Sequence, residues 1–135
     1  GRINSMDKAL ARCLRYVLND VNAGFTKDTF DLTNICDFNH LVLLSNVLTA
    51  FRFIHCPLLD NFSVFKLITS ISQRSSRAAE SNKIIVPRFK HVKDDFCFLI
   101  AGARQWNILP NSLTSVNNFN VFKLGVYDFI KECLP

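Results

Sequence analysis

One segment, FNHLVLLSNVLTAFRFIHC at residues 38–56, carries apolar side chains on nearly every side of the helix that its spacing predicts. A helix that is apolar all round must be covered on all sides, so it belongs at the centre of a fold. Asp37 stands directly before it as a candidate N-cap, and Pro57 stops it. We therefore predict a central helix near residues 38–55.

Amphipathic helices are expected on both sides of this central segment. In MDKALARCLRYVLNDV, apolar residues recur at helical spacing, which predicts a helix near 6–22 capped by Ser5 or Asp7 and ended by Asn22 to Gly24. Near the other end, VNNFNVFKLGVYDFIKECL predicts a helix near 115–133 that Thr114 or Ser115 caps and Gly125 weakens. Three cations of the first segment lie off its apolar stripe: Lys8, Arg12 and Arg15.

The remaining segments carry weaker signals. Residues 25–36 are expected to form a loop or short turn, and NFSVFKLITSI (61–71) a third, shorter helix. The polar run QRSSRAAESN (73–82) lacks periodicity, which predicts a mobile loop. KIIVP (83–87) is β-branched and favours a strand, while DFCFLI (95–100) either pairs with it or opens a helix.

These elements indicate a mainly α fold: a compact helical domain with at most a short two-stranded β-ribbon in its second half. Residues 1–5 are expected to be a remnant of cloning outside the fold, and residues 6–135 to form a single domain. Within it we expect a helical half (6–72), a mobile loop (73–82) and a second half (83–135). The expected core is Leu14, Val17, Leu44, Leu48, Phe51, Trp106, Phe122 and Phe129.

Composition places the chain among intracellular proteins. Its 135 residues suffice for one core without disulfides or metal, and the five cysteines are an odd number without clustered spacing. We therefore expect reduced thiols, and an intracellular location, nuclear and cytoplasmic. The longest apolar stretch (41–56) is interrupted by polar residues and falls short of a membrane span, so no membrane association is expected. The net charge of +5 favours an anionic partner.

The second half of the chain contains an ordered series of short motifs. They are an arginine-bearing polar loop with Arg74 and Arg77, then Val86-Pro87-Arg88, a segment with Phe96 and Phe98, GARQWNILP at 102–110, and Phe119 with Phe122-Lys123. This series resembles the C-terminal tail of reverse transcriptases from non-LTR (LINE, jockey-like) retrotransposons. Residues 86–123 carry the specific part of the resemblance, which extends more loosely over residues 6–130. Ile108 departs from the pattern, because the family often has a small polar residue there.

The resemblance implies a module that follows the polymerase in a protein that copies RNA into DNA at a nicked chromosomal target. The parent protein would be an RNA-directed DNA polymerase. The polymerase and endonuclease motifs of that family lie outside this region, so the resemblance supplies no catalytic residue.

Basic residues of the second half are the main functional signal in the sequence itself. Residues 73–104 contain seven Lys or Arg and three Asp or Glu. Cations on a mobile or edge element suit phosphate contacts, although an ordinary solvated loop has the same composition. For Trp106, the sequence favours a role in core packing over base stacking, since Gly102 and Ala103 allow close approach of the backbone. The candidate nucleic-acid-binding residues are Arg74, Arg77, Lys83, Arg88, Lys90, Lys93 and Arg104.

No pattern in the sequence predicts a catalytic residue, a metal site or a cofactor. Asp94-Asp95 precedes an apolar segment as in a polymerase strand, but no third carboxylate stands on a neighbouring strand to bridge two metal ions. Cys36 and His40 are separated from His55 and Cys56 by most of the central helix, about 22 Å at 1.5 Å per residue, so they cannot share one zinc ion. A Cys–His nucleophile would lack an orienting acid.

Two functions remain open. The first is an accessory domain that binds element RNA or an RNA/DNA primer–template duplex beside the rest of the reverse transcriptase. The second is a protein–protein interaction module, either docking within the polyprotein or domesticated by a host, whose exposed apolar patch the 13 phenylalanines would supply.

Overall fold

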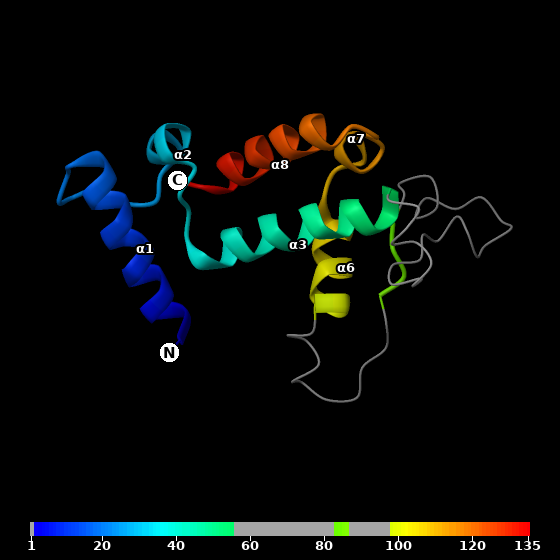
Figure 1. The fold of residues 1–135 in the computed structure, drawn as a ribbon, viewed down its shortest axis with the longest axis horizontal. Helices are drawn as coiled ribbons and strands as arrows, with labels where there is room; N and C mark the ends of the chain where they lie inside the picture. Colours follow the sequence, from blue (N-terminus) through cyan, green and yellow to red (C-terminus); the bar gives the residue numbers. More distant parts are fainter. Residues whose placement is uncertain (1, 56–82, 87–97) are drawn as a thin grey trace, which may run out of the picture. The chain divides into compact units, whose positions relative to one another are not determined.

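The computed structural model describes residues 2–55, 83–86 and 98–135 (Figure 1). Within these ranges the chain forms six helices and no strand, which confirms the mainly α fold class. None of the helices in the described part combines the length and the apolar character that crossing a membrane requires. The expected helix at 61–71 and the expected loop at 73–82 lie outside the described residues.

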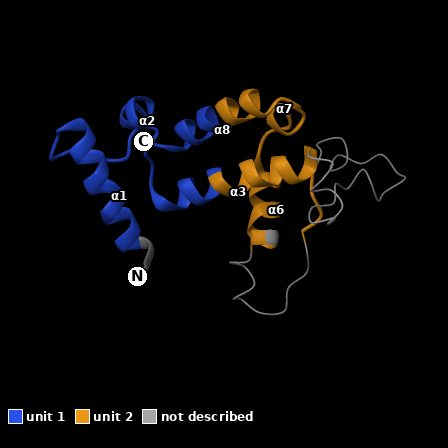
Figure 2. Cartoon of the chain, in the orientation of Figure 1, with its two compact units in different colours: residues 1–44, 126–135 blue, residues 45–125 orange. Residues whose placement is uncertain are grey.

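The chain divides into two compact units (Figure 2). Unit 1 comprises residues 1–44 and 126–135, and unit 2 comprises residues 45–125. Both boundaries fall inside helices: α3 (Phe38–His55) and α8 (Phe119–Cys133) each contribute residues to both units.

Unit 1 begins with α1 (Arg2–Leu18), which includes residues 2–5. The helix ends earlier than expected. Asn19 adopts the left-handed conformation, and the N–H groups of Asn19 and Asp20 donate to the carbonyls of Tyr16 and Arg15. These two bonds form a Schellman motif, with asparagine in the place that glycine usually takes. The expectation that Gly24 ends this helix was therefore wrong.

The expectation of a loop at 25–36 was also wrong, because α2 (Lys27–Thr33) forms there. Thr26 and Thr29 build a capping box in which each hydroxyl accepts the backbone N–H of the other residue. Asn34, left-handed at φ 57°, closes the other end. Helix α8 and the C-terminal residues hold α2: the Lys27 N–H donates to the Pro135 carbonyl (3.0 Å), and Phe30 packs edge-on against Tyr127.

The predicted central helix is confirmed as α3, from Phe38 to His55. The carboxylate of Asp7, within α1, accepts the N–H of Phe38 at 2.7 Å. Asp7 therefore caps α3 and not its own helix. Asp37 stands at the expected N-cap position, but its carboxylate pairs with the Nδ1 atom of His40.

Unit 2 has its core at α6 (Phe98–Ile108), so the described end of the segment 95–100 belongs to a helix. Trp106 is 1% exposed, and its ring lies 5.4 Å from that of Phe122 on α8. Phe122 in turn stacks on Phe51 of α3, at 4.6 Å and 21° between the ring planes. Stacked rings in this distance range add to the free energy of burying their area.

The C-terminal helix starts later than predicted. A four-residue helix, α7 (Asn111–Thr114), follows Pro110, and Thr114 ends it instead of capping α8. The N-cap of α8 is Asn118, whose side-chain oxygen accepts the N–H of Val121 at 3.1 Å. A Cβ atom at Gly125 would lie 2.2 Å from Leu113, so the glycine within α8 makes room for the α7 side chain.

The expected core is largely confirmed. Leu14, Leu44, Phe51, Trp106 and Phe122 are buried, and Leu48 and Phe129 are half-buried. The prediction that Val17 belongs to the core is wrong. Val17 is 60% exposed, and the neighbouring Leu18 is half-buried in its place.

Candidate nucleic-acid interface

The structure describes two of the seven candidate nucleic-acid-binding residues. Lys83 is half-buried at the start of the extended segment 83–86, and Arg104 is exposed on α6. Both belong to unit 2. The other five lie outside the described residues: Arg74, Arg77, Arg88, Lys90 and Lys93.

Asn107 holds the segment next to Lys83 against α6. Its side-chain oxygen accepts the N–H of Ile84 at 2.7 Å, and its side-chain nitrogen donates to the carbonyl of Ile84 at 2.8 Å. The amide thus satisfies both backbone groups of a residue that is 1% exposed. We call this pair of bonds the Asn107 clip. Within the described ranges, Ile84 is the only residue in a β-bridge, in keeping with a fold that contains at most a short ribbon.

The clip brings Lys83 and Arg104 to the same part of unit 2. Lys83 is the neighbour of the clipped residue, and Arg104 stands one turn before Asn107 on α6. Residues three apart on a helix are neighbours on its surface. The adjacent Gln105 accepts a bond at 2.7 Å from the side-chain nitrogen of Asn46, which fixes the same turn of α6 to α3.

Trp106 packs in the core, as the close approach of Gly102 and Ala103 indicates. Gly102 and Ala103 are themselves buried one turn before the ring. Leu109, also buried, follows with its N–H bonded to the Trp106 carbonyl. A ring that is 1% exposed has no face open to a base, so the stacking alternative is excluded for Trp106. Ile108 is exposed.

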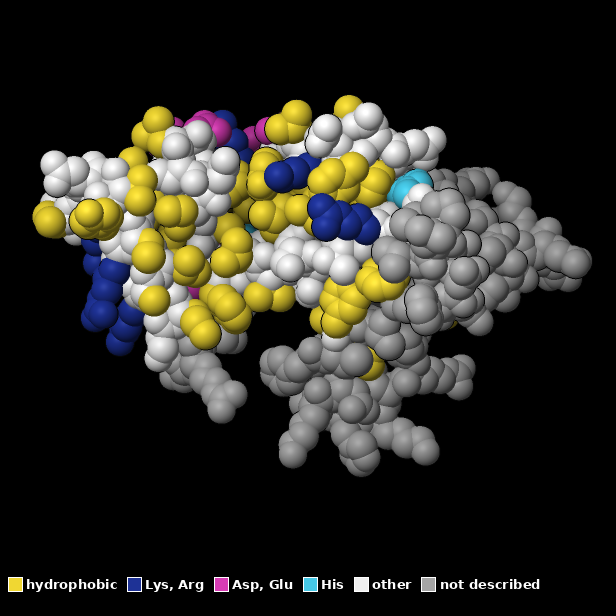
Figure 3. Space-filling view, in the orientation of Figure 1, with side chains coloured by type: hydrophobic (Ala, Val, Ile, Leu, Met, Phe, Trp, Pro, Cys, Tyr) yellow, Lys and Arg dark blue, Asp and Glu magenta, His cyan; other side chains and the backbone are white. Residues whose placement is uncertain are grey.

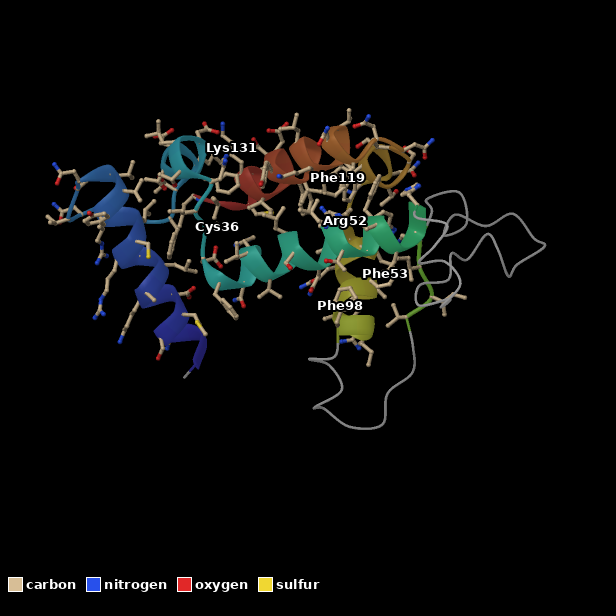
Figure 4. The ribbon with its side chains drawn as sticks, viewed as in Figure 1. Cys36, Arg52, Phe53, Phe98, Phe119 and Lys131 are labelled. Carbon is tan, nitrogen blue, oxygen red and sulfur yellow. The ribbon has the colours of Figure 1, made fainter. Side chains whose placement is uncertain are left out.

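Arg52 is a further cation of unit 2, which the sequence did not predict as a site residue. Its guanidinium group lies against an aromatic ring. The guanidinium carbon of Arg52 on α3 is 4.7 Å from the centroid of Phe119 on α8 (Figure 4). This distance is within the range of a cation–π interaction. Arg52 is exposed and Phe119 half-buried. The space-filling view shows basic side chains bordered by apolar ones on this part of the surface (Figure 3).

Charge is distributed unequally between the units. Residues 45–125 contain ten Lys or Arg and four Asp or Glu, whereas residues 1–44 with 126–135 contain six and seven. In the part of unit 2 that the structure describes there are four Lys or Arg and no Asp or Glu. The positive net charge of the chain therefore resides in unit 2.

The cysteines and histidines considered as metal ligands have other roles where the structure describes them. No group of three metal-binding side chains occurs among the described residues. Burial, with the nearby Asp37 carboxylate, raises the pKa of the Cys36 thiol to about 11, so it stays protonated at neutral pH and is a poor nucleophile. His55 stacks on Phe51 at 4.2 Å, and burial lowers its pKa. Asp94, Asp95 and Cys56 lie outside the described residues.

Comparisons with known proteins give no match: no family model, no curated protein and no solved structure corresponds to this chain.

Proposed function

We propose that this chain is a non-catalytic module that binds nucleic acid, of the kind found after the polymerase in non-LTR retrotransposon reverse transcriptases. Its ligand would be element RNA or an RNA/DNA primer–template duplex. The observation that carries the proposal is the excess of positive charge in unit 2, ten Lys or Arg against four Asp or Glu. Binding to phosphates is driven by such an excess, because each neutralised phosphate releases condensed counterions.

The described contacts hold in place the backbone that carries two of these cations, Lys83 and Arg104. The Asn107 clip fixes the backbone next to Lys83, and Arg104 stands on the same helix as the clip. Trp106 anchors that helix in the core. The residues of the GARQWNILP motif therefore serve mainly to build the support, while the cations beside it would contact phosphates.

A titration of the purified chain against structured RNA, single-stranded RNA and an RNA/DNA duplex, at two salt concentrations, tests the proposal. Replacing Arg88 and Lys90 by Ala should flatten the dependence of log affinity on log salt by about 1.5, since each contact contributes about 0.7 to 0.9. The melting temperature should stay nearly unchanged. No measurable binding at low salt by the unaltered chain would remove the proposal.

A protein-interaction module is the second candidate. The expected source of its surface was exposed phenylalanine, but all nine described phenylalanines are buried or half-buried. Among the described residues of unit 2, the exposed large apolar side chains are aliphatic, such as Val121 and Leu124 on α8. They are the first surface to mutate if the chain acts through a protein partner.

A further inference from the structure

Unit 1 contains a surface feature that neither its core nor its ion pairs explain. Tyr16 on α1 is 89% exposed, the most exposed of the large apolar side chains in the described residues. Because Tyr16 is so exposed, both faces of its ring are accessible to a stacking partner.

Two cations stand in line with this ring. Lys8, Arg12 and Tyr16 follow one another at intervals of four residues on α1, and all three are exposed. Residues at this interval are neighbours on the helix surface, so the three side chains form a single ridge about 12 Å long. We call it the α1 ridge. Arg15 flanks it, with its Nε atom donating to the Ala23 carbonyl at 3.2 Å.

The acidic residues of unit 1 do not neutralise the α1 ridge. Asp7, the one acid within α1, bonds to the Phe38 N–H on another side of the helix. Asp31 and Glu132 pair with Lys131 and Lys27, respectively. Among the described residues, neither Lys8 nor Arg12 has an acidic partner. In Figure 3 basic side chains gather along α1, beside exposed apolar ones.

We propose that the α1 ridge, formed by Lys8, Arg12 and Tyr16, is a contact site for single-stranded nucleic acid. Cations that follow the backbone, next to a ring on which a base stacks, are the combination by which proteins bind single strands without reading sequence. A duplex offers phosphates to the two cations but no free base face to Tyr16. The proposal rests on the proposed nucleic-acid function, and it adds a site outside the basic segment of unit 2.

The test uses the full chain with two fluorescent probes, a 20-nucleotide oligouridylate and a duplex RNA of the same length. Replacing Tyr16 by Ala should weaken oligouridylate binding about 5- to 150-fold, the effect expected of one stacked base, and should change duplex binding much less. Tyr16→Phe keeps the ring and should bind nearly as the unaltered chain. Leu32→Ala, which removes another exposed apolar side chain of unit 1, is the matched control and should have no effect.

The charges of the ridge are tested in the same assay. The pair Lys8→Ala and Arg12→Ala should lower the salt slope of oligouridylate binding by about 1.4, from about 0.7 per contact. The pair Lys27→Ala and Lys131→Ala removes the same charge from cations that are already paired, and should leave the slope unchanged. A circular dichroism melt of each variant confirms that it is folded.

The outcomes separate this site from the proposed function. If the chain binds RNA and the unit 2 variants weaken binding, but the ridge variants bind normally, the ridge proposal is overturned and the function stands. If the chain binds no nucleic acid at low salt, both are overturned. If Tyr16→Ala weakens binding to phosphatidylserine vesicles but not to oligouridylate, the ridge faces a membrane surface and the proposal is likewise overturned.

Discussion

Unit 1 contains ion pairs between its helices, whereas the described part of unit 2 is held by packed rings and side-chain amides. In unit 1, Lys131 and Lys27 pair with Asp31 and Glu132 between α8 and α2. In unit 2, Phe51, Phe122 and Trp106 stack in series, and Asn107 clips Ile84. The pairs of unit 1 are largely exposed, and such pairs contribute about 0–1 kcal/mol each.

The difference teaches where charge is available for a partner. In unit 1, most acidic side chains pair with cations or backbone N–H groups of the same unit. The two cations of the α1 ridge take no part in these ion pairs. The described part of unit 2 contains no Asp or Glu. No ion pair within that part therefore contributes to its stability. The described cations of unit 2 thus outnumber its described acids by four to none, and one of them, Arg52, lies over the Phe119 ring.

The largest effect should come from Trp106. Trp106→Ala removes the fully buried ring at one end of the aromatic series and should lower the free energy of unfolding by about 3–5 kcal/mol, since a large buried ring is replaced by a cavity. Guanidinium denaturation followed by circular dichroism measures it. Val121→Ala, an exposed apolar change on α8, is the control and should cost less than about 0.5 kcal/mol. A Trp106→Ala variant as stable as the unaltered chain would show that the rings do not hold unit 2 together.

A smaller loss is expected from the Asn107 clip. Asn107→Ala removes two hydrogen bonds to the backbone of the buried Ile84, which should cost about 1–3 kcal/mol at about 0.5–1.5 kcal/mol per bond. Hydrogen exchange of the Ile84 amide should become faster in the same variant. Asn117→Ala, at an exposed asparagine, is the comparison. Unchanged protection of Ile84 would mean that other contacts hold this segment.

The smallest effect is confined to unit 1 and to alkaline pH. The pKa of Cys36 is raised from 9.0 to about 11 in the fold, mainly by burial. Between these values the unfolded chain has lost the thiol proton and the folded chain keeps it, so stability is complete below about pH 9 and falls as the pH rises toward 11. The loss is at most about 3 kcal/mol.

Denaturation midpoints at pH 8 and pH 10.5 measure this loss, and Cys36→Ala should make the decline shallower. Cys13→Ala, at an exposed cysteine of the same unit, should not. Equal declines in all three proteins would assign the alkaline loss to other groups.

Much of the fold could be predicted from the sequence, and the failures have physical causes. The bounds of α3 followed from a long apolar run between Asp37 and Pro57. Helix α2 was missed because its seven residues have no long-range periodicity and contacts with α8 and the C-terminal residues help to hold it. The signal that was present is local: Thr26 and Thr29 at capping-box spacing, with Asp28 in the first turn.

The helix ends and the site show the same limit. Asn118 caps α8 where Thr114 and Ser115 were expected, because all three residue types suit an N-cap and only the tertiary packing decides among them. The sequence indicated that Trp106 is core, but not that Asn107 bonds to a residue 23 positions away. Arg52 over Phe119 was also missed, because a cation–ring contact between two helices leaves no spacing in the sequence.

The Asn107 clip also makes the two positions that it joins unequal in what they tolerate. Asn107 recognises only the backbone of residue 84, so at that position any apolar side chain that fills the same space preserves the bonds. Position 107 has no such freedom. Aspartate there would turn the donating nitrogen into a second acceptor facing the Ile84 carbonyl, so even deamidation, a change of one functional group with almost no change in shape, would turn one bond of the clip into a repulsion.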